Sequence, residues 1–352
     1  MYGYGYRYNS GLVIGGDAPL DTTFKITVDT TKAGSASDTF VLPLYNGATN
    51  MTVYWGDGSS DLITAYNQAE LTHVYSLSGS YQITLDGSFY GITFANTGDK
   101  LKLSSIDNWG LNVWGIMNFA FYGCSNMTAN YSDSPDTSSV QKMFQAFSGC
   151  TLFNGDLNIN TSLVSDMRNM FYNCTNFNGY VPFDTSNVTV ISDMFYGCTN
   201  FNQPVNFNTV KATSTVRMFM FCSSFNQSIN FDMSAVGSTT LMFYQCTSFN
   251  STVTFTNGSG VTSFSNTFNG CTIFNQDISA FDITSLTSAA SMLIGTAFSK
   301  TNYDLLLPVW DAYGTSNVPF HAGTAHYSAG APTTAHDAMV SRGWTITDGG
   351  TP

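Results

Sequence analysis

The seven cysteines of this chain recur at a nearly constant spacing. They are separated by 26, 24, 24, 24, 24 and 25 residues, with Phe three positions before each one and a large apolar residue three positions after. Self-similarity at a fixed period predicts a repeat architecture, in which each unit buries its apolar side chains against its neighbours. The cysteines are Cys124, Cys150, Cys174, Cys198, Cys222, Cys246 and Cys271.

One repeat unit, residues 170–193, indicates how the chain runs within each rung. Val181 and Phe183 alternate with more polar residues, which is typical of a short strand with one buried face. Val188, Ile191 and Phe195 follow at helical spacing, so we expect a short helix or 3₁₀ turn that leads into the next unit. Stacking of such units predicts a continuous apolar core that runs along a column of repeats.

The other residues that recur in each repeat are predicted to have structural roles. Asn occupies the fourth position after six of the seven cysteines, and stacking predicts an Asn ladder that satisfies backbone groups. The cysteines lack zinc-type spacing, and parallel Cβ vectors do not suit a disulfide. We therefore expect buried thiols, no metal and no cofactor.

Units such as AFYGCSNM from Ala120 and MFYGCTNFNQPVNF from Met194 resemble BspA-type leucine-rich repeats of bacterial surface proteins. The Phe-rich form followed by FDTSNV from Phe183 is similar to the DUF285 variant. The resemblance implies a right-handed solenoid of about seven rungs over residues 98–299, with a parallel sheet, used for adhesion or protein recognition. It implies no chemistry.

Residues 23–97 differ from the repeats. Short alternating segments with Gly- and Asp-rich turns predict a β-sandwich. The segments TVYWGDGSSD from Thr52 and LTHVYSLSGSYQITLDG from Leu71 resemble the PKD module, an immunoglobulin-like spacer or contact domain. On this resemblance Trp55 packs in the core and Tyr75 and Tyr81 lie on late strands, and we expect neither calcium binding nor catalysis at Asp57 and Asp61.

The two ends of the chain have separate assignments. Residues 1–22 are rich in Gly and Tyr, and we expect them to anchor the protein on a neighbouring subunit. Residues 300–352 are predicted to be a small α/β cap, with a helix from an N-cap at Thr301, a second helix near Thr333 and a final strand. The complete prediction is a mainly β protein: an N-terminal immunoglobulin-like sandwich, a leucine-rich-repeat solenoid and this cap.

Composition limits the partners of the chain. Charged residues make up only 10% of the sequence, and the net charge of −12 opposes contact with nucleic acid or anionic membranes. No segment has the length of apolar sequence needed to span a membrane, and the first residues lack the apolar run of a secretory signal. A virion protein needs no such signal, so we expect a location on a virion surface, with an extracellular or cell-surface location as the alternative.

Enzymatic function is the weaker hypothesis. His321 and His326 could pair with Ser328 or Asp337, but no GxSxG or HExxH motif accompanies them. Paired carboxylates for glycoside cleavage would have to come from aspartates scattered along the repeats. We therefore predict no catalytic residue and no metal site.

The outward-facing strand positions form the candidate ligand-binding face. Amide, carboxylate and aromatic side chains in rows suit a glycan, although they are equally compatible with plain solvated positions. The candidate residues are Asp156, Asn158, Asn160, Tyr180, Asp184, Asn206, Asn208, Asn230 and Asp232.

These features favour a non-enzymatic virion protein of the capsid surface, tail or fibre that displays its repeats for adhesion to a host-surface protein or glycan. We expect contacts with other virion proteins through the N-terminal segment and sandwich, and a homo-oligomer within an assembly. A bacterial cell-surface adhesin is the first alternative. A carbohydrate-degrading depolymerase is the second.

Overall fold

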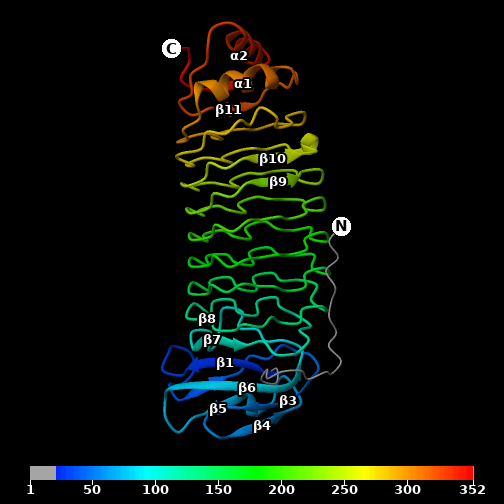
Figure 1. The fold of residues 1–352 in the computed structure, drawn as a ribbon, viewed down its shortest axis with the longest axis vertical. Helices are drawn as coiled ribbons and strands as arrows, with labels where there is room; N and C mark the ends of the chain where they lie inside the picture. Colours follow the sequence, from blue (N-terminus) through cyan, green and yellow to red (C-terminus); the bar gives the residue numbers. More distant parts are fainter. Residues whose placement is uncertain (1–20, 352) are drawn as a thin grey trace, which may run out of the picture.

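The computed structural model describes residues 21–351, and the repeats form an elongated column. A β-sheet region lies at the N-terminal end of the column and two helices lie at the other end (Figure 1). The predicted anchoring segment, residues 1–22, lies outside the described residues except for its last two positions. Strands and turns dominate and helix is scarce, so the predicted mainly β class is confirmed.

A six-stranded sheet forms the N-terminal end, in the order β4-β3-β6-β1-β7-β8. Its pairs are antiparallel except for β7 with β8. Strands β2 and β5 form a separate antiparallel pair, and the 3₁₀ turn η1 (Ala69–Leu71) precedes β5. The bounds are β1 Phe24–Asp29, β2 Thr39–Val41, β3 Thr49–Tyr54, β4 Ser60–Ile63, β5 Thr72–Val74, β6 Ser80–Phe89, β7 Leu103–Asn108 and β8 Thr128–Ala129.

Aromatic side chains pack in the core of this N-terminal region. The Trp55 indole is fully buried, and its Nε1 donates to Asp61 Oδ2 at 2.8 Å. The Tyr75 hydroxyl donates to the Trp55 carbonyl at 3.0 Å, and the Tyr75 ring stacks on Tyr81 with 3.7 Å between ring centroids. The predicted burial of Trp55 is therefore confirmed.

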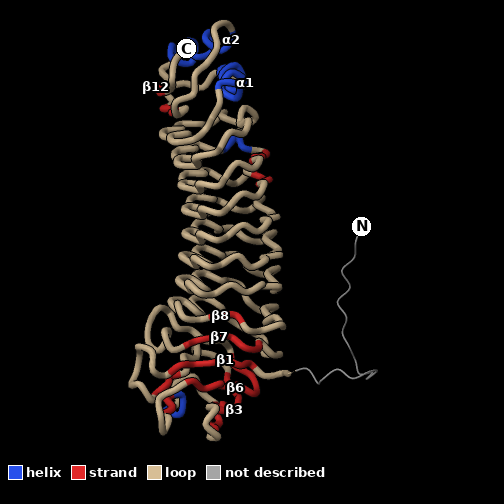
Figure 2. Tube along the Cα trace, turned by 60° about the vertical axis from the view of Figure 1, so that its left-hand side comes forward, coloured by secondary structure: helices blue, strands red, loops and turns tan. Residues whose placement is uncertain are grey.

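The sheet continues into the first repeats without an intervening linker. Strand β7 lies beyond the predicted boundary at residues 97/98, yet it pairs antiparallel with β1. Strand β8 then pairs parallel with β7, which begins the parallel stacking of the column. Figure 2 shows strands concentrated at this end of the molecule. One continuous hydrophobic core therefore runs from the sheet through the repeats to the cap.

Phenylalanines occupy the interior of the column in two parallel rows. In the row that precedes the cysteines, Phe171, Phe195 and Phe219 stack with centroids 5.6 Å apart and ring planes within 5°. In the second row, Phe177 and Phe201 are 5.8 Å apart. Within a rung the two rows touch, as Phe171 and Phe177 do at 4.2 Å. Each ring therefore contacts copies of itself above and below, as the repeat pattern predicts.

Of the short helix or 3₁₀ turn predicted before the cysteines, only turns form, closed by bonds three residues back such as those from the N–H groups of Tyr196 and Cys198 to Asp193 and Phe195. A helix requires each N–H to bond four residues back, whereas the N–H groups of Asp193 and Phe195 donate to Val216 and Met218 of the next repeat. Asp193 also has a φ of 58°, and the equivalent Asn169 and Arg217 have 54° and 55°. These left-handed residues break the helical path, and a series of tight turns replaces it.

The predicted parallel sheet is present only in part. Strands β9 (Ile229–Asp232) and β10 (Val253–Thr256) pair in parallel, followed by the 3₁₀ turn η2 (Gly258–Gly260). The equivalent segments from residue 155 to residue 208 form no strand. Pro182 and Pro204 explain the interruption, because proline has no N–H to donate to a ladder.

All seven cysteines are buried and reduced. The thiol of Cys198 donates to the carbonyl of Phe171 at 2.9 Å, and the thiol of Cys222 repeats this contact with Phe195. Burial raises the pKa of Cys174 to about 12. The prediction of small, buried, unpaired thiols is confirmed.

The Asn ladder also forms. The backbone N–H of Asn202 donates to Asn178 Oδ1 at 2.8 Å, and the N–H of Asn226 donates to Asn202 Oδ1 at 2.9 Å. The same bond links Asn250 to Asn226 and Asn275 to Asn250. Each amide therefore joins its own repeat to the following one.

The C-terminal cap closes the other end of the column. Helix α1 (Lys300–Asp311) packs against α2 (Ala331–Ser341), and β11 (Pro319–His321) pairs in parallel with β12 (Thr345–Thr347). The predicted N-cap at Thr301 is wrong, since the Ser299 hydroxyl accepts from the N–H of Asn302. Neither helix of the described chain has the length and apolar character needed to cross a bilayer.

Native thiols should be unreactive. The thiolate is the reacting form of cysteine. Because the thiols are fully buried and the pKa of Cys174 is raised, almost no accessible thiolate is present at pH 8. We expect iodoacetamide to label none of the seven cysteines in the folded protein and all seven in denaturant, as read by intact-mass spectrometry. Rapid labelling of folded Cys198 or Cys222 would contradict the buried column.

The Asn ladder should contribute to stability through its acceptor oxygen. Asn202→Ala leaves the N–H of Asn226 without its partner, and we expect a loss of about 0.5–1.5 kcal/mol. Asn202→Asp keeps an acceptor in place and should cost less. Urea denaturation followed by circular dichroism measures both variants, and equal losses would argue against the ladder bond.

Candidate functional site

The structure places the predicted ligand-binding positions on the outside of the column. Asp156, Asn158, Tyr180 and Asn206 are exposed, and they alternate along each rung with buried residues such as Phe183. Asn160, Asp184, Asn208 and Asn230 are also exposed, and Asp232 is half-buried. The alternation of the two faces therefore persists even where no strand ladder forms.

Four of these predicted residues already have a structural task. The side chain of Asp184 accepts from the N–H of Ser186 at 2.9 Å, which closes a turn two residues further on. This backbone bond, with the Ser186 hydroxyl, lowers the pKa of the Asp184 carboxyl. The same turn bond is made at the equivalent positions Asn160, Asn208 and Asp232. Their oxygens are partly occupied, so this row is a weak candidate for ligand contact.

Four of the other five predicted residues border two small hollows, and Asn230 borders neither. Tyr180, Pro182, Pro204 and Asn206 surround a hollow of about 230 Å³. Asp156 and Asn158 border another of about 440 Å³, together with Tyr131 and Asp133. The carboxylate of Asp156 also accepts from the N–H of Tyr180 at 2.8 Å. Of the predicted face, Tyr180 and Asn206 are the side chains best placed to meet a ligand.

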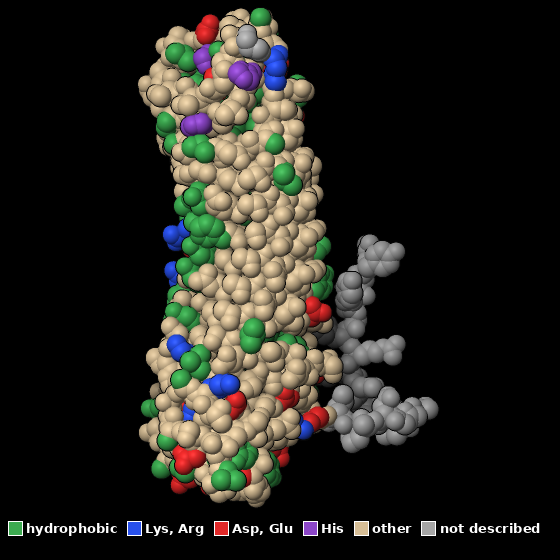
Figure 3. Space-filling model, turned by 90° about the vertical axis from the view of Figure 1, so that its left-hand side faces the viewer, with side chains coloured by type: hydrophobic (Ala, Val, Ile, Leu, Met, Phe, Trp, Pro, Cys, Tyr) green, Lys and Arg blue, Asp and Glu red, His purple; other side chains and the backbone are tan. Residues whose placement is uncertain are grey.

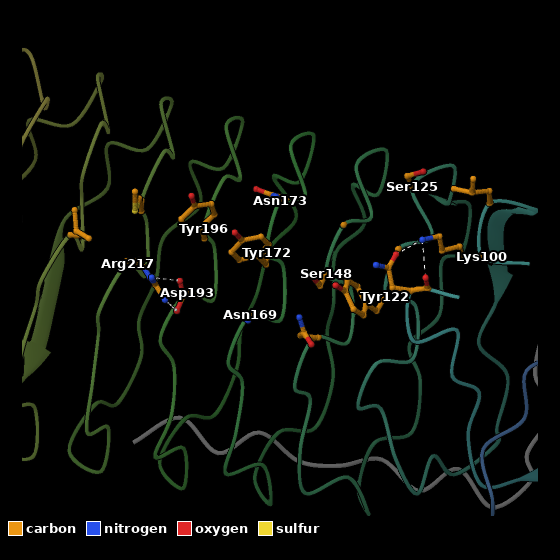
Figure 4. Close-up of a pocket in the computed structure, with 17 residues that line it drawn as sticks. Lys100, Tyr122, Ser125, Ser148, Asn169, Tyr172, Asn173, Asp193, Tyr196 and Arg217 are labelled. Carbon is orange, nitrogen blue, oxygen red and sulfur yellow. Dashed lines mark hydrogen bonds and ion pairs between the residues drawn. The ribbon is translucent and has the colours of Figure 1, made fainter. Parts of the chain in front are cut away.

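A larger groove of about 730 Å³ lies over the turns that precede the cysteines, and the sequence-based prediction missed it. Figure 4 shows it crossing several successive rungs. Left-handed residues of these turns, including Gln145, Asn169 and Asp193, are among its lining residues. Gly149 also borders it. Every second backbone N–H of this segment is bonded to the next repeat, which holds the walls in fixed register.

The groove combines aromatic, amide and paired charged groups. Tyr172 and Tyr196 stack with centroids 4.4 Å apart and planes 9° apart. Arg217 forms a two-point ion pair with Asp193, at 2.7 Å from Nε and 3.1 Å from Nη2. This hydrogen bonding to Asp193 raises the pKa of Arg217. The groove thus places stacked tyrosines beside a mutually paired cation and carboxylate.

A signal for the groove is present in the sequence. The position two residues before each cysteine holds, in successive repeats, Tyr122, Ser148, Tyr172, Tyr196, Met220, Tyr244 and Asn269. Aromatic residues that recur at one repeat position without being buried indicate a surface stripe. Aligning the repeats at this column, rather than only at the cysteines, would have identified it.

The histidines do not form the hydrolase arrangement considered from the sequence. The Ser328 hydroxyl donates to Asp304 Oδ2 at 2.6 Å, while His321 Nδ1 accepts from the N–H of Gly323. His326 Nδ1 lies 3.2 Å from the carbonyl of Gly350. Over residues 21–351, no group of three or more His, Cys, Asp or Glu side chains is placed to hold a metal ion.

The Asp57 turn has a structural arrangement of its own. Asp57 Oδ1 accepts from the N–H and hydroxyl of Ser59, and Asp57 Oδ2 lies 2.9 Å from His73 Nε2. The His73 ring stacks on Trp55 at 4.7 Å. Burial alone would raise the pKa of Asp57, but these hydrogen bonds outweigh it and lower the pKa to about 2.

The Asp57 contacts should make stability fall in acid. A carboxyl whose pKa drops from 3.8 to about 2 on folding stabilises the protein above pH 4 and loses that contribution as the pH falls toward 2. We expect Asp57→Asn to lower the melting temperature at pH 7, and to narrow its difference from the wild type between pH 4 and pH 2. A difference that stays constant across this range would contradict the assignment.

Comparison with known proteins identifies the repeats. The family model described as "Mycoplasma protein of unknown function, DUF285" matches residues 88–181, 158–254 and 228–318 in tandem. No curated protein and no solved structure gives a match. The three ranges together run from residue 88 to residue 318, well over half of the 352 residues. The chain therefore belongs to the DUF285 family.

Proposed function

We propose that this protein is a non-enzymatic surface-display protein that binds a host-surface protein or glycan along the side of its repeat column. The observation that carries the proposal is the groove of about 730 Å³, which crosses successive rungs and combines tyrosines with amides. Tyrosine and amide side chains in a concave site are typical of binding surfaces. In this proposal the elongated column holds the binding surface away from its point of attachment, and the repeats place the contacting side chains at a fixed spacing.

The proposal also gives the finer architecture. We interpret the column as a right-handed leucine-rich-repeat solenoid, and the N-terminal sheets as an immunoglobulin-like module related to PKD domains. The WGDG turn supports the second interpretation, because Gly56 and Gly58 have φ values of 85° and 94° there. In this proposal the module and the preceding segment attach the column to its neighbours in an assembly.

We propose a virion surface as the setting, with a bacterial cell surface as the alternative. The low content of charged residues supports an exposed display protein that stays hydrated through hydroxyl and amide groups. Figure 3 shows few charged side chains over the middle of one face of the column. Mass spectrometry of purified particles and of cell envelopes from the source culture separates the two settings.

A depolymerase is the competing function. It would need two carboxyl groups with free access to a bound glycan. Asp184 and Asp232 are engaged in their own turns, and Asp193 is paired with Arg217. These engagements favour binding over cleavage.

The experiment applies labelled full-length protein to an array of neutral glycans, acidic glycans and cell-surface proteins, and assays bound polysaccharides for new reducing ends. We expect binding without release of reducing ends. Tyr180→Ala tests the sequence-predicted face, with Tyr66→Ala as a matched control because Tyr66 is exposed on the N-terminal region. We expect Tyr196→Ala, which alters the groove, to weaken binding and Tyr66→Ala to leave it unchanged. Loss of binding in Tyr180→Ala instead would place the ligand on the sequence-predicted face.

Two outcomes would contradict the proposed function. Binding to no glycan, protein or intact cell would remove the adhesive role. Release of reducing ends from a bound polysaccharide would favour the depolymerase.

A further inference from the structure

We propose that a small hollow at the junction of the N-terminal sheet and the repeats binds the carboxylate of an acidic sugar, such as a sialic or hexuronic acid of a host glycan. The inference rests on the proposed adhesive function and adds to it the chemical class of one ligand. It assigns a site apart from the groove and from the sequence-predicted face. It follows from one basic side chain, Lys142, that the protein leaves without a counter-charge.

Lys142 differs from the other basic residues of the structure. Within residues 21–351 it is the one Lys or Arg side chain that forms neither an ion pair nor a hydrogen bond. Each of the others contacts a protein oxygen; they are Lys25, Lys32, Lys100, Lys102, Arg168, Lys211, Arg217, Lys300 and Arg342. The ammonium group of Lys142 is therefore available to an anionic ligand.

The carboxylate beside Lys142 in the repeat register is engaged elsewhere. Lys142 and Asp166 are parallel bridge partners in neighbouring rungs. Both oxygens of Asp166 accept from Arg168, at 3.1 Å from Nε and 2.8 Å from Nη2. The guanidinium carbon of Arg168 also lies 5.0 Å from the centre of the Phe144 ring. These contacts hold Asp166 on Arg168 and leave Lys142 unpaired.

The basic residues of the repeats share one side of the column with this hollow. Between residues 103 and 299 every Lys and Arg lies 5 to 11 residues before a cysteine; they are Lys142, Arg168, Lys211 and Arg217. The same segments contain two carboxylates, Asp166 and Asp193, each paired with an arginine. Four cations and two carboxylates leave +2 on this side of a chain whose net charge is −12. An acidic ligand is therefore attracted to this side of the repeats.

The hollow beside Lys142 has a rigid aromatic wall. It measures about 220 Å³ and is bordered by Tyr90, which directly follows β6 and is 39% exposed. A Cβ on Gly115 would lie 2.2 Å from the Tyr90 ring and one on Gly47 would lie 2.4 Å from it, so both backbones touch the ring and fix it. The C–H face of a sugar can pack on such a ring. Pockets for drug-sized molecules begin at about 300 Å³, so this smaller hollow suits a single sugar ring.

The polar groups of the hollow supply donors and no competing acid. Of residues 21–351, no Asp or Glu borders it. Asn118 Oδ1 accepts from the N–H of Phe144 at 3.1 Å, which orients this amide and directs its NH₂ group elsewhere. The exposed side chains of Ser139 and Gln141 also border the hollow and can meet sugar hydroxyls. One cation matches the single charge of a sugar carboxylate better than the nearly double charge of a phosphate monoester.

The test compares each acidic sugar with its own methyl ester, which keeps the ring but loses the charge. We would titrate the full chain with sialyllactose, with a methyl glucuronoside and with the methyl esters of both, and measure Kd by ligand-observed NMR. Lys142→Gln removes the charge and keeps a side chain of similar length. Lys211→Gln is the matched control, because Lys211 is an exposed cation of the same side that does not border the hollow.

We expect the wild type to bind at least one of the acidic sugars, and to bind its methyl ester about tenfold more weakly. Lys142→Gln should raise Kd for the acidic sugar by about the same factor, because the unpaired cation is lost. Lys211→Gln should stay within about twofold of the wild type. Thermal melting shows whether each variant is folded.

The assignment is overturned if the wild type binds neither acidic sugar, if the methyl esters bind equally well, or if Lys142→Gln leaves Kd unchanged. Acetate or an acidic peptide that binds as tightly as the sugars would show recognition of charge alone, and would also reject a sugar site. Adhesion itself is read separately, from the array of glycans, proteins and cells. Binding there, combined with no effect of Lys142→Gln, would reject this site and leave the adhesive function standing.

Discussion

Face-to-face stacking of identical phenylalanines fixes the register of the whole column. A shift of one residue between neighbouring repeats would separate Phe195 from Phe171 and Phe219, and would break the thiol bonds from Cys198 and Cys222 at the same time. The apolar interior and its hydrogen bonds therefore specify the same alignment. This alignment also fixes the positions of the surface side chains of the repeats, including those of both candidate binding faces.

The turns before the cysteines follow from this constraint. A phenylalanine can return to the axis of the column every 24 residues only if the chain reverses sharply, and left-handed residues such as Asn169 and Asp193 make that reversal. Their N–H groups donate to carbonyls of the next repeat, as do the N–H groups of the phenylalanines. The groove is a by-product of this geometry, because the turn residues stand outward in rows beside small or glycine positions.

The sequence predicted what depends on repetition and missed what depends on backbone conformation. The buried Phe and Cys rows and the Asn ladder could be predicted, since each follows from stacking alone. Of the helix or 3₁₀ turn expected around Val188–Phe195, only turns form, because apolar spacing of three and four arises equally from successive turns. The parallel sheet was overestimated, since Pro182 removes a donor that the alternation of apolar residues does not report. The groove could not be predicted from the alternation of the strand positions, because its residues lie at turn positions.

The bonds between repeats have a broader consequence. Each unit presents the same donors to one neighbour and the same acceptors to the other, as the matching contacts of Asn202 and Asn226 illustrate. Loss or duplication of one unit by recombination would bring equivalent surfaces together again, with no new interface to evolve. Copy number can therefore change the height of the molecule in steps of one repeat.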